Sequence, residues 1–110
     1  MRFNHHQFVT IARLGDIPEG EGRIFTVDNQ RIAVFRSAGQ HYALQNACPH
    51  MGESLGLGDV RGDRVICDRH QWAFRLRDGT CEESDQWRAQ TYPVRIRNDQ
   101  IQVAVTDSPE

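Results

Sequence analysis

Short runs of alternating hydrophobic and polar residues recur along this chain, which is the pattern of half-buried β-strands. Turn-forming residues separate the runs, as at Asp28-Asn29-Gln30, Ser37-Ala38-Gly39-Gln40 and Asp78-Gly79. No heptad pattern or internal repeat is present, so we expect little helix and an all-β fold. The predicted strands are residues 7–14, 23–27, 31–36, 41–44, 64–66, 73–76, 91–96 and 100–105.

Length and charge narrow the choice of partners. The chain has 110 residues, which indicates one domain, residues 1–110. Its 13 basic and 15 acidic residues give a formal net charge of −2, so no polycationic surface for nucleic acid is expected. No apolar run reaches membrane-spanning length, and residues 1–6 do not read as a secretory leader. We therefore expect a cytoplasmic protein with no membrane partner.

Metal-ligating residues are concentrated in two short motifs. Cys48-Pro49-His50 has the form C-x-H, and Cys67-Asp68-Arg69-His70 has the form C-x-x-H. Each motif supplies one thiol and one imidazole, a donor set that suits iron–sulfur chemistry. A structural Cys₂His₂ zinc site uses the same donors, but zinc motifs usually keep like ligands together. The mixed pairs therefore favour an iron–sulfur centre over zinc.

This arrangement resembles the Rieske [2Fe–2S] signature. The resemblance implies that Cys48 and Cys67 bind one iron of a [2Fe–2S] cluster and that His50 and His70 bind the other. It also implies an antiparallel β-sandwich or barrel with a smaller β subdomain that carries two ligand loops. We expect the base to comprise residues 1–45 and 88–106, and the cluster-binding portion to comprise residues 46–87.

Further segments resemble one branch of this family, the small subunit of assimilatory NAD(P)H-dependent nitrite reductase. They are Cys-Pro-His-Met-Gly at 48–52, His-Gln-Trp-Ala-Phe at 70–74, Phe-Arg-Leu-Arg-Asp-Gly-Thr-Cys at 74–81 and Tyr-Pro-Val-Arg-Ile at 92–96. The resemblance implies a large partner subunit with FAD and sirohaem that reduces nitrite to ammonia.

Two other functions fit the same ligand motif. One is a stand-alone Rieske ferredoxin that carries electrons from a flavin reductase to an oxygenase, and the other is a structural or sensor module. In each case we expect no catalytic residues on this chain, because it has no nucleophile–base pair and no phosphate-binding loop.

The residues around the motifs bear on redox potential and docking. High-potential Rieske proteins place a serine and a tyrosine where this chain has Trp72 and Phe74, and they carry an extra cysteine in each ligand loop. Fewer hydrogen bonds to the cluster sulfurs disfavour the reduced state, so we expect a low potential. The imidazoles of His50 and His70 are expected near solvent, where reduction couples to proton uptake. Met51, Leu55 and Trp72 are either core residues or an apolar docking rim.

The remaining candidates have ordinary interpretations. Cys81 is expected to be a small buried hydrophobe, with its pKa raised beside Glu82 and Glu83. The acidic run 82–85 is expected to be a solvated loop, or a surface that steers a basic partner. His5, His6 and His41 have no ligand-like spacing and are expected to be solvated or structural.

Overall fold

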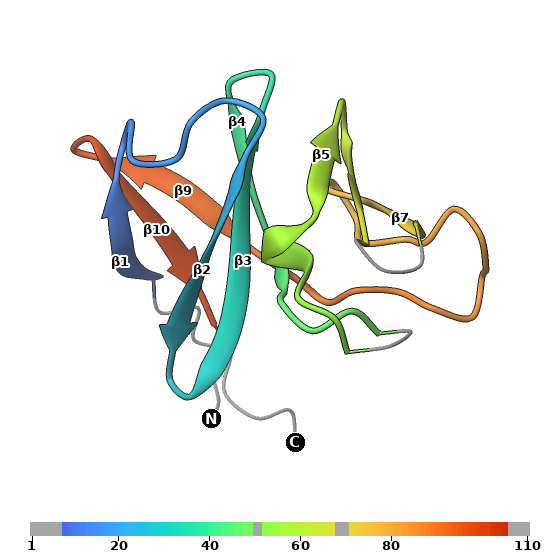
Figure 1. Ribbon diagram of the computed structural model, residues 1–110. Helices are drawn as coiled ribbons and strands as arrows, with labels where there is room; N and C mark the ends of the chain where they lie inside the picture. The colour runs from blue at the N-terminus through green and yellow to red at the C-terminus, as the bar shows by residue number, and fades with distance from the viewer. Residues whose placement is uncertain (1–7, 50–51, 68–70, 106–110) are drawn as a thin grey trace.

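The described residues form antiparallel strands and one short 3-10 turn (Figure 1). The computed structural model describes residues 8–49, 52–67 and 71–105. The elements are β1 (Phe8–Arg13), β2 (Gly22–Val27), β3 (Gln30–Ser37), β4 (Gln40–Gln45), η1 (Leu55–Leu57), β5 (Asp59–Arg61), β6 (Arg64–Ile66), β7 (Ala73–Arg75), β8 (Thr91–Tyr92), β9 (Val94–Arg97) and β10 (Gln100–Ala104). This confirms the all-β prediction. None of the described segments is a helix long and apolar enough to span a membrane.

The described strands form three antiparallel sheets. One has the order β1-β10-β9, the second β2-β3-β4-β8 and the third β5-β6-β7. Figure 1 shows the first two sheets facing each other, with the small third sheet set to one side and η1 between. The structure therefore has a larger two-sheet base and a smaller β portion, which agrees with the fold that the resemblance implies.

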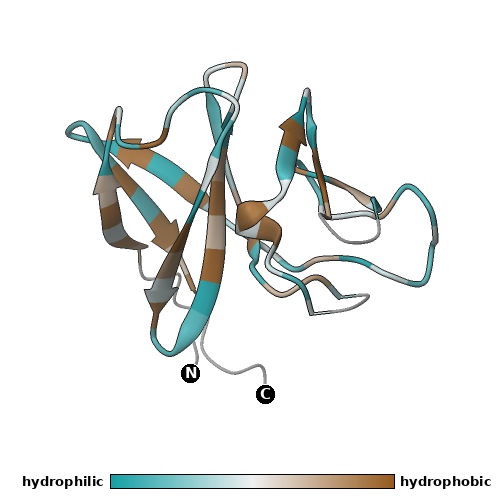
Figure 2. Cartoon of the chain, viewed as in Figure 1, coloured by the Kyte–Doolittle hydropathy of each residue, from teal (hydrophilic) through white to brown (hydrophobic). Residues whose placement is uncertain are grey.

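Strand β3 contributes side chains to both hydrophobic cores of the described structure. Successive side chains on a strand point to opposite faces of its sheet. Ile32 and Val34 accordingly pack in the core between the two base sheets, whereas Ala33 and Phe35 pack in the core toward the small sheet. All four are fully buried. Figure 2 shows the resulting apolar stretch along β3, which explains why this strand carries an unbroken hydrophobic run.

Among the described residues, three of the four hairpins with two-residue turns share one backbone geometry. Asp28 and Asn29 join β2 to β3, Ala38 and Gly39 join β3 to β4, and Asn98 and Asp99 join β9 to β10. Both central residues of each turn have φ between 50° and 77°. This is the type I′ geometry, whose twist matches that of paired strands, and Asn, Asp and Gly tolerate it best.

The predicted strand 91–96 is wrong as a single element. Pro93 divides it, so that Tyr92 pairs with Ala43 in one sheet and Val94 pairs with Val103 in another. Proline has no N–H to donate to a ladder, so the chain changes sheets at this residue. Elements η1 and β5 were not predicted from the sequence.

Candidate metal centre

Two of the four predicted ligands fall within the described residues. Cys48 and Cys67 are 2% and 1% exposed, and both border the core toward the small sheet. The chain's three cysteines form no disulfide. His50 and His70 lie outside the described residues. Within those residues, no three His, Cys, Asp or Glu side chains form a metal-binding group.

Backbone hydrogen bonds close the first loop directly on Cys48. Its N–H donates to the carbonyl oxygen of Glu53 at 2.7 Å, and its carbonyl accepts from the N–H of Gly52 at 2.7 Å. Gly52 has φ +77°, a left-handed conformation that glycine adopts without steric cost. Glycine at position 52 therefore lets the loop turn back on its cysteine.

The second loop repeats this closure around Cys67. The Cys67 N–H donates to the carbonyl of Trp72 at 2.7 Å, and the Cys67 carbonyl accepts from the N–H of Gln71 at 2.8 Å. Gln71 takes the place of Gly52, and it is also left-handed, with φ +60°. The two cysteines therefore occupy equivalent positions in loops closed by the same backbone pattern.

The buried amide of Asn46 anchors the first loop. Its Oδ1 accepts from the N–H of Gly56 at 2.9 Å, and its Nδ2 donates to the hydroxyl of Ser54 at 2.9 Å. That hydroxyl lies 3.1 Å from Oδ1 and donates back to it. Asn46 is 7% exposed, so these bonds satisfy an otherwise costly buried amide. Asn46 was not predicted from the sequence, because its contacts form only in the folded loop.

Two acidic residues have contacts that the solvated-loop interpretation missed. Glu82 forms ion pairs with Arg64 at 3.2 Å and with Arg75 at 3.6 Å. Glu83 accepts the N–H of Ala73 at 2.8 Å through its Oε1. Part of the predicted wet loop therefore fastens the small sheet, although the carboxylates remain at the surface.

The docking-rim interpretation fails for Leu55, which is fully buried in the core. Leu57, two residues later, is instead 73% exposed, which was not predicted from the sequence. Trp72 is partly buried against the same core, so the core interpretation holds for part of its surface. Met51 lies outside the described residues.

Cys81 is a buried, protonated thiol, as predicted. It is 6% exposed, and burial is the main cause that raises its pKa, with the Glu83 charge a lesser one. Its Sγ lies 3.7 Å from Glu83 Oε1, an arrangement in which the thiol donates. This hydrogen bond gives the Cys81 thiol a partner of its own in Glu83.

His41 is a structural residue within the base. Burial, together with the Arg36 charge, lowers its pKa, which keeps the imidazole neutral over a wider range of pH. His5 and His6 lie outside the described residues.

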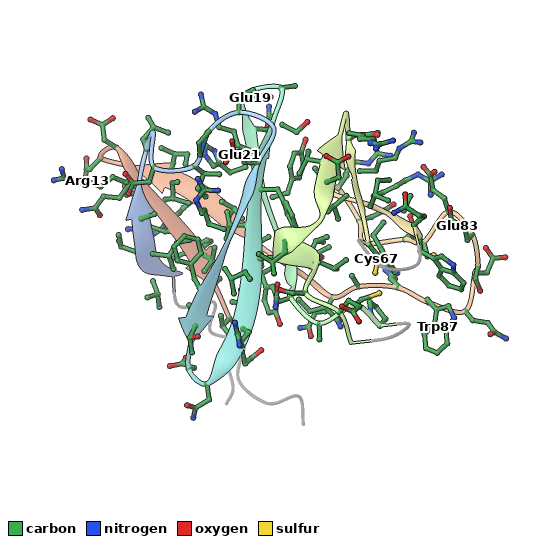
Figure 3. All side chains as sticks on the ribbon, viewed as in Figure 1. Arg13, Glu19, Glu21, Cys67, Glu83 and Trp87 are labelled. Atoms are coloured by element: carbon green, nitrogen blue, oxygen red, sulfur yellow. The ribbon has the colours of Figure 1, made fainter. Side chains whose placement is uncertain are left out.

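The described half of the site fits a [2Fe–2S] cluster. Thiolates are the preferred protein ligands of such clusters, and two thiols stand at matched positions against a common core. Each loop is closed by two short backbone hydrogen bonds, so its cysteine is held in place independently of any metal. Figure 3 labels Cys67 in the smaller part of the molecule.

Comparisons with known proteins agree with this architecture. The family described as Rieske [2Fe-2S] domain matches residues 7–97. The naphthalene 1,2-dioxygenase/salicylate 5-hydroxylase ferredoxin component of Ralstonia sp is 32% identical, covering 83% of this chain and 88% of its own. The carbazole 1,9a-dioxygenase ferredoxin of Nocardioides aromaticivorans IC177 superposes with a TM-score of 0.83 at 26% identity, covering 88% of this chain and 96% of that one.

A solved structure that carries a nitrite reductase name shares the fold as well. The protein described as the NADH-dependent nitrite reductase small subunit of Mycobacterium tuberculosis superposes with a TM-score of 0.87 at 24% identity. The match covers 97% of this chain and 100% of that one. At this identity the likeness speaks for the fold alone.

The fold and the paired loops define an electron-transfer protein with an iron–sulfur centre. The chain belongs to the Rieske [2Fe–2S] domain family, and its cofactor is a Rieske-type [2Fe–2S] cluster.

Proposed function

We propose that Cys48, His50, Cys67 and His70 are the cluster ligands, with the two thiolates on one iron and the two imidazoles on the other. The equivalent closure of the two loops supports this assignment, because it gives both cysteines the same backbone environment. The bound cluster supplies reversible one-electron chemistry. The chain's own part is to bury the two thiols and hold the two loops.

We propose that the chain has a base and a cluster-binding portion, each organised around one of the two hydrophobic cores. Residues 1–45 and 88–106 act as the base, and residues 46–87 act as the cluster-binding portion. Strand β3 contributes to both cores, which supports a rigid connection between base and loops. A rigid scaffold favours electron transfer, because the protein around the cluster rearranges little when the cluster gains or loses an electron.

We propose that the protein is a ferredoxin that takes electrons from a flavin reductase and delivers them to an oxygenase. The observation that carries this is the relation to the Ralstonia ferredoxin component, which extends over most of both chains at 32% identity. A carrier of this kind needs no substrate pocket of its own, and the cytoplasmic location expected from the sequence stays a prediction.

The second candidate is the small subunit of NAD(P)H-dependent nitrite reductase, with a large sirohaem and FAD subunit as its partner. It is favoured by the segments 74–81 and 92–96. The structure, however, gives one of these segments a role in folding. The Asp78 carboxylate accepts from the Thr80 N–H at 3.0 Å, and Gly79 at φ +76° forms the turn against Ala89. These residues are therefore explained without a nitrite reductase partner.

One reconstitution separates the two candidates. The cluster-loaded protein is mixed with the reductase and oxygenase components of a naphthalene dioxygenase system and NADH, and product formation is followed. In parallel it is mixed with the large subunit of an NADH-dependent nitrite reductase, and nitrite consumption and co-elution are followed. Restored oxygenase turnover supports the ferredoxin. Stable co-elution with a gain in nitrite turnover, and no oxygenase turnover, would move the assignment to the nitrite reductase subunit.

A further inference from the structure

One peptide group closes the second ligand loop and is held at both of its ends. It joins Trp72 to Ala73. Its carbonyl oxygen accepts the N–H of Cys67 at 2.7 Å, and its N–H donates to Glu83 Oε1 at 2.8 Å. A single peptide plane therefore connects a carboxylate in the acidic run to the backbone of a proposed ligand. Figure 3 shows Glu83 and Cys67 in the same part of the molecule.

We propose that Glu83 is a positioning residue for the iron–sulfur centre, acting through the Trp72–Ala73 peptide on Cys67. This inference rests on the proposed function, in which Cys67 is a ligand. Glu83 fixes the exit of the ligand loop, and its negative charge lowers the midpoint potential of the centre.

The hydrogen bonds along this path reinforce one another. A carboxylate that accepts a peptide N–H makes a stronger bond than a neutral acceptor, and it polarises the peptide so that the carbonyl becomes a better acceptor. The carbonyl of Trp72 therefore holds the Cys67 N–H more firmly. The Ala73 N–H is partly buried, so losing its acceptor would leave an unsatisfied donor in the loop exit.

The Glu83 carboxylate is itself held in place. The Cys81 thiol donates to the same Oε1 at 3.7 Å, and burial keeps this thiol protonated. The Glu82 N–H donates to the carbonyl of Ala73 at 2.9 Å, which pairs the acidic run with the start of β7. Glu83 is thus placed by the backbone of its own segment and by a neighbouring side chain.

The adjacent residue, Glu82, is a natural control. Its carboxylate pairs with Arg64 and Arg75, whereas among the described residues Glu83 forms no ion pair. Both residues carry one negative charge, they are neighbours in the chain, and only Glu83 touches the loop peptide through its side chain. A variant of Glu82 removes a charge from the same region without disturbing that hydrogen bond.

The test compares Glu83→Gln, Glu83→Ala and Glu82→Gln in the cluster-loaded protein. Glutamine at 83 keeps an acceptor for the Ala73 N–H and loses the charge, whereas alanine loses both. Midpoint potentials are measured by spectroelectrochemical titration. Exchange of backbone amides in a peptide spanning residues 66–75 is measured by hydrogen–deuterium exchange with mass spectrometry.

Three results are expected. Glu83→Gln raises the midpoint by at least a threefold change in the reduction equilibrium, about 28 mV for one electron. Glu83→Ala raises it as well and speeds exchange in residues 66–75, and the glutamine variant restores the protection. Glu82→Gln shifts the potential by less than half as much and leaves exchange in this segment unchanged.

Two results would overturn the inference. Equal potentials in Glu83→Gln and Glu82→Gln, with unchanged exchange in Glu83→Ala, would show that Glu83 is only a surface carboxylate. That outcome leaves the proposed function intact, since the cluster is still bound. Failure of the unmodified chain to bind an iron–sulfur cluster overturns both proposals, and the iron content of the unmodified protein distinguishes the two cases.

Discussion

Cys48 and Cys67 make the same two backbone hydrogen bonds although 18 residues of loop and strand separate them. Each N–H donates to the carbonyl five residues later, and each carbonyl accepts from the N–H four residues later. In both loops the residue at that fourth position is left-handed. Two buried thiols therefore have the same backbone surroundings. This is the geometric reason for assigning the two loops to one metal centre.

The left-handed residue of the first loop gives the first prediction. Gly52→Ala is expected to lower the free energy of unfolding by about 1 kcal/mol, because alanine is strained at φ +77° even though no atom of the described residues lies within 4 Å of the added Cβ. Loss of iron–sulfur absorbance in the presence of a chelator is expected to be severalfold faster. Gly20→Ala is the control, since Gly20 has φ +81° and equally open surroundings in the base. It should cost similar stability without speeding cluster loss, and equal rates in the two variants would contradict the role given to loop closure.

The anchor of the first loop gives the second prediction. Asn46→Ala is expected to destabilise the protein by about 2–3 kcal/mol, because the N–H of Gly56 and the hydroxyl of Ser54 both lose a buried partner. Ser54→Ala should cost about 1 kcal/mol. Urea unfolding of the single and double variants forms a double-mutant cycle, in which a coupling near zero would show that the two side chains do not act together.

The turn in the Asp78–Cys81 segment gives the third prediction. Gly79 and Gly39 have nearly the same φ, +76° and +77°, but a Cβ on Gly79 would lie 2.0 Å from the carbonyl oxygen of Ala89, whereas Gly39 is open. Gly39→Ala should cost about 1 kcal/mol and Gly79→Ala more than about 3 kcal/mol, because the latter adds a backbone clash to the same strain. Thermal unfolding of the two variants measures the difference. Equal costs would refute the structural explanation of this segment.

Acid stability gives the fourth prediction. Backbone N–H groups of Gly39 and Ala38 donate to the Glu19 carboxylate and hold its pKa below the usual 4.5. A lowered folded-state pKa contributes stability that is present above pH 4.5 and is lost as the pH falls through the folded value. At pH 7, Glu19→Gln should therefore unfold at a lower urea concentration than the unmodified protein. The difference between the two urea midpoints should become smaller below pH 4.5.

A nearby glutamate provides the control for this pH effect. The carboxylate of Glu21 pairs with the exposed side chain of Arg23 at 2.9 Å. Exposed pairs of this kind contribute little. At pH 7, the urea midpoint of Glu21→Gln should therefore differ less from that of the unmodified protein than the midpoint of Glu19→Gln does. If the difference in urea midpoint between Glu19→Gln and the unmodified protein stayed constant from pH 7 to pH 3, the charged Glu19 carboxylate would not be the source of the stability.

Local sequence signals were sufficient for much of the base. The continuous apolar run in β3 and the Asp, Asn and Gly residues of the hairpin turns act within a few residues of themselves, so they predict strands and turns directly. Pro93 was the exception. Its apolar neighbours read as one strand, and only the missing N–H shows that the strand divides between two sheets.

The supports of the site were harder to predict than the ligand motifs. The motifs stand out because Cys and His at fixed spacing carry a specific chemistry. Asn46, Leu55 and Glu83 act through contacts that form only when distant segments meet, as when Glu83 reaches Ala73 across a turn. A run of acidic residues does not indicate which carboxylate will accept a backbone N–H. The whole run was therefore expected to be a solvated loop.

The central claim is that Cys48, His50, Cys67 and His70 hold a [2Fe–2S] cluster. The most direct measurement is pulsed electron paramagnetic resonance of the reduced protein with ¹⁵N-labelled histidine, together with iron and sulfide analysis. The account predicts two irons and two sulfides per chain and coupling to two histidine nitrogens, one of which is lost in His70→Ala. A colourless protein that contains zinc, or a cluster with no histidine coupling, would contradict it.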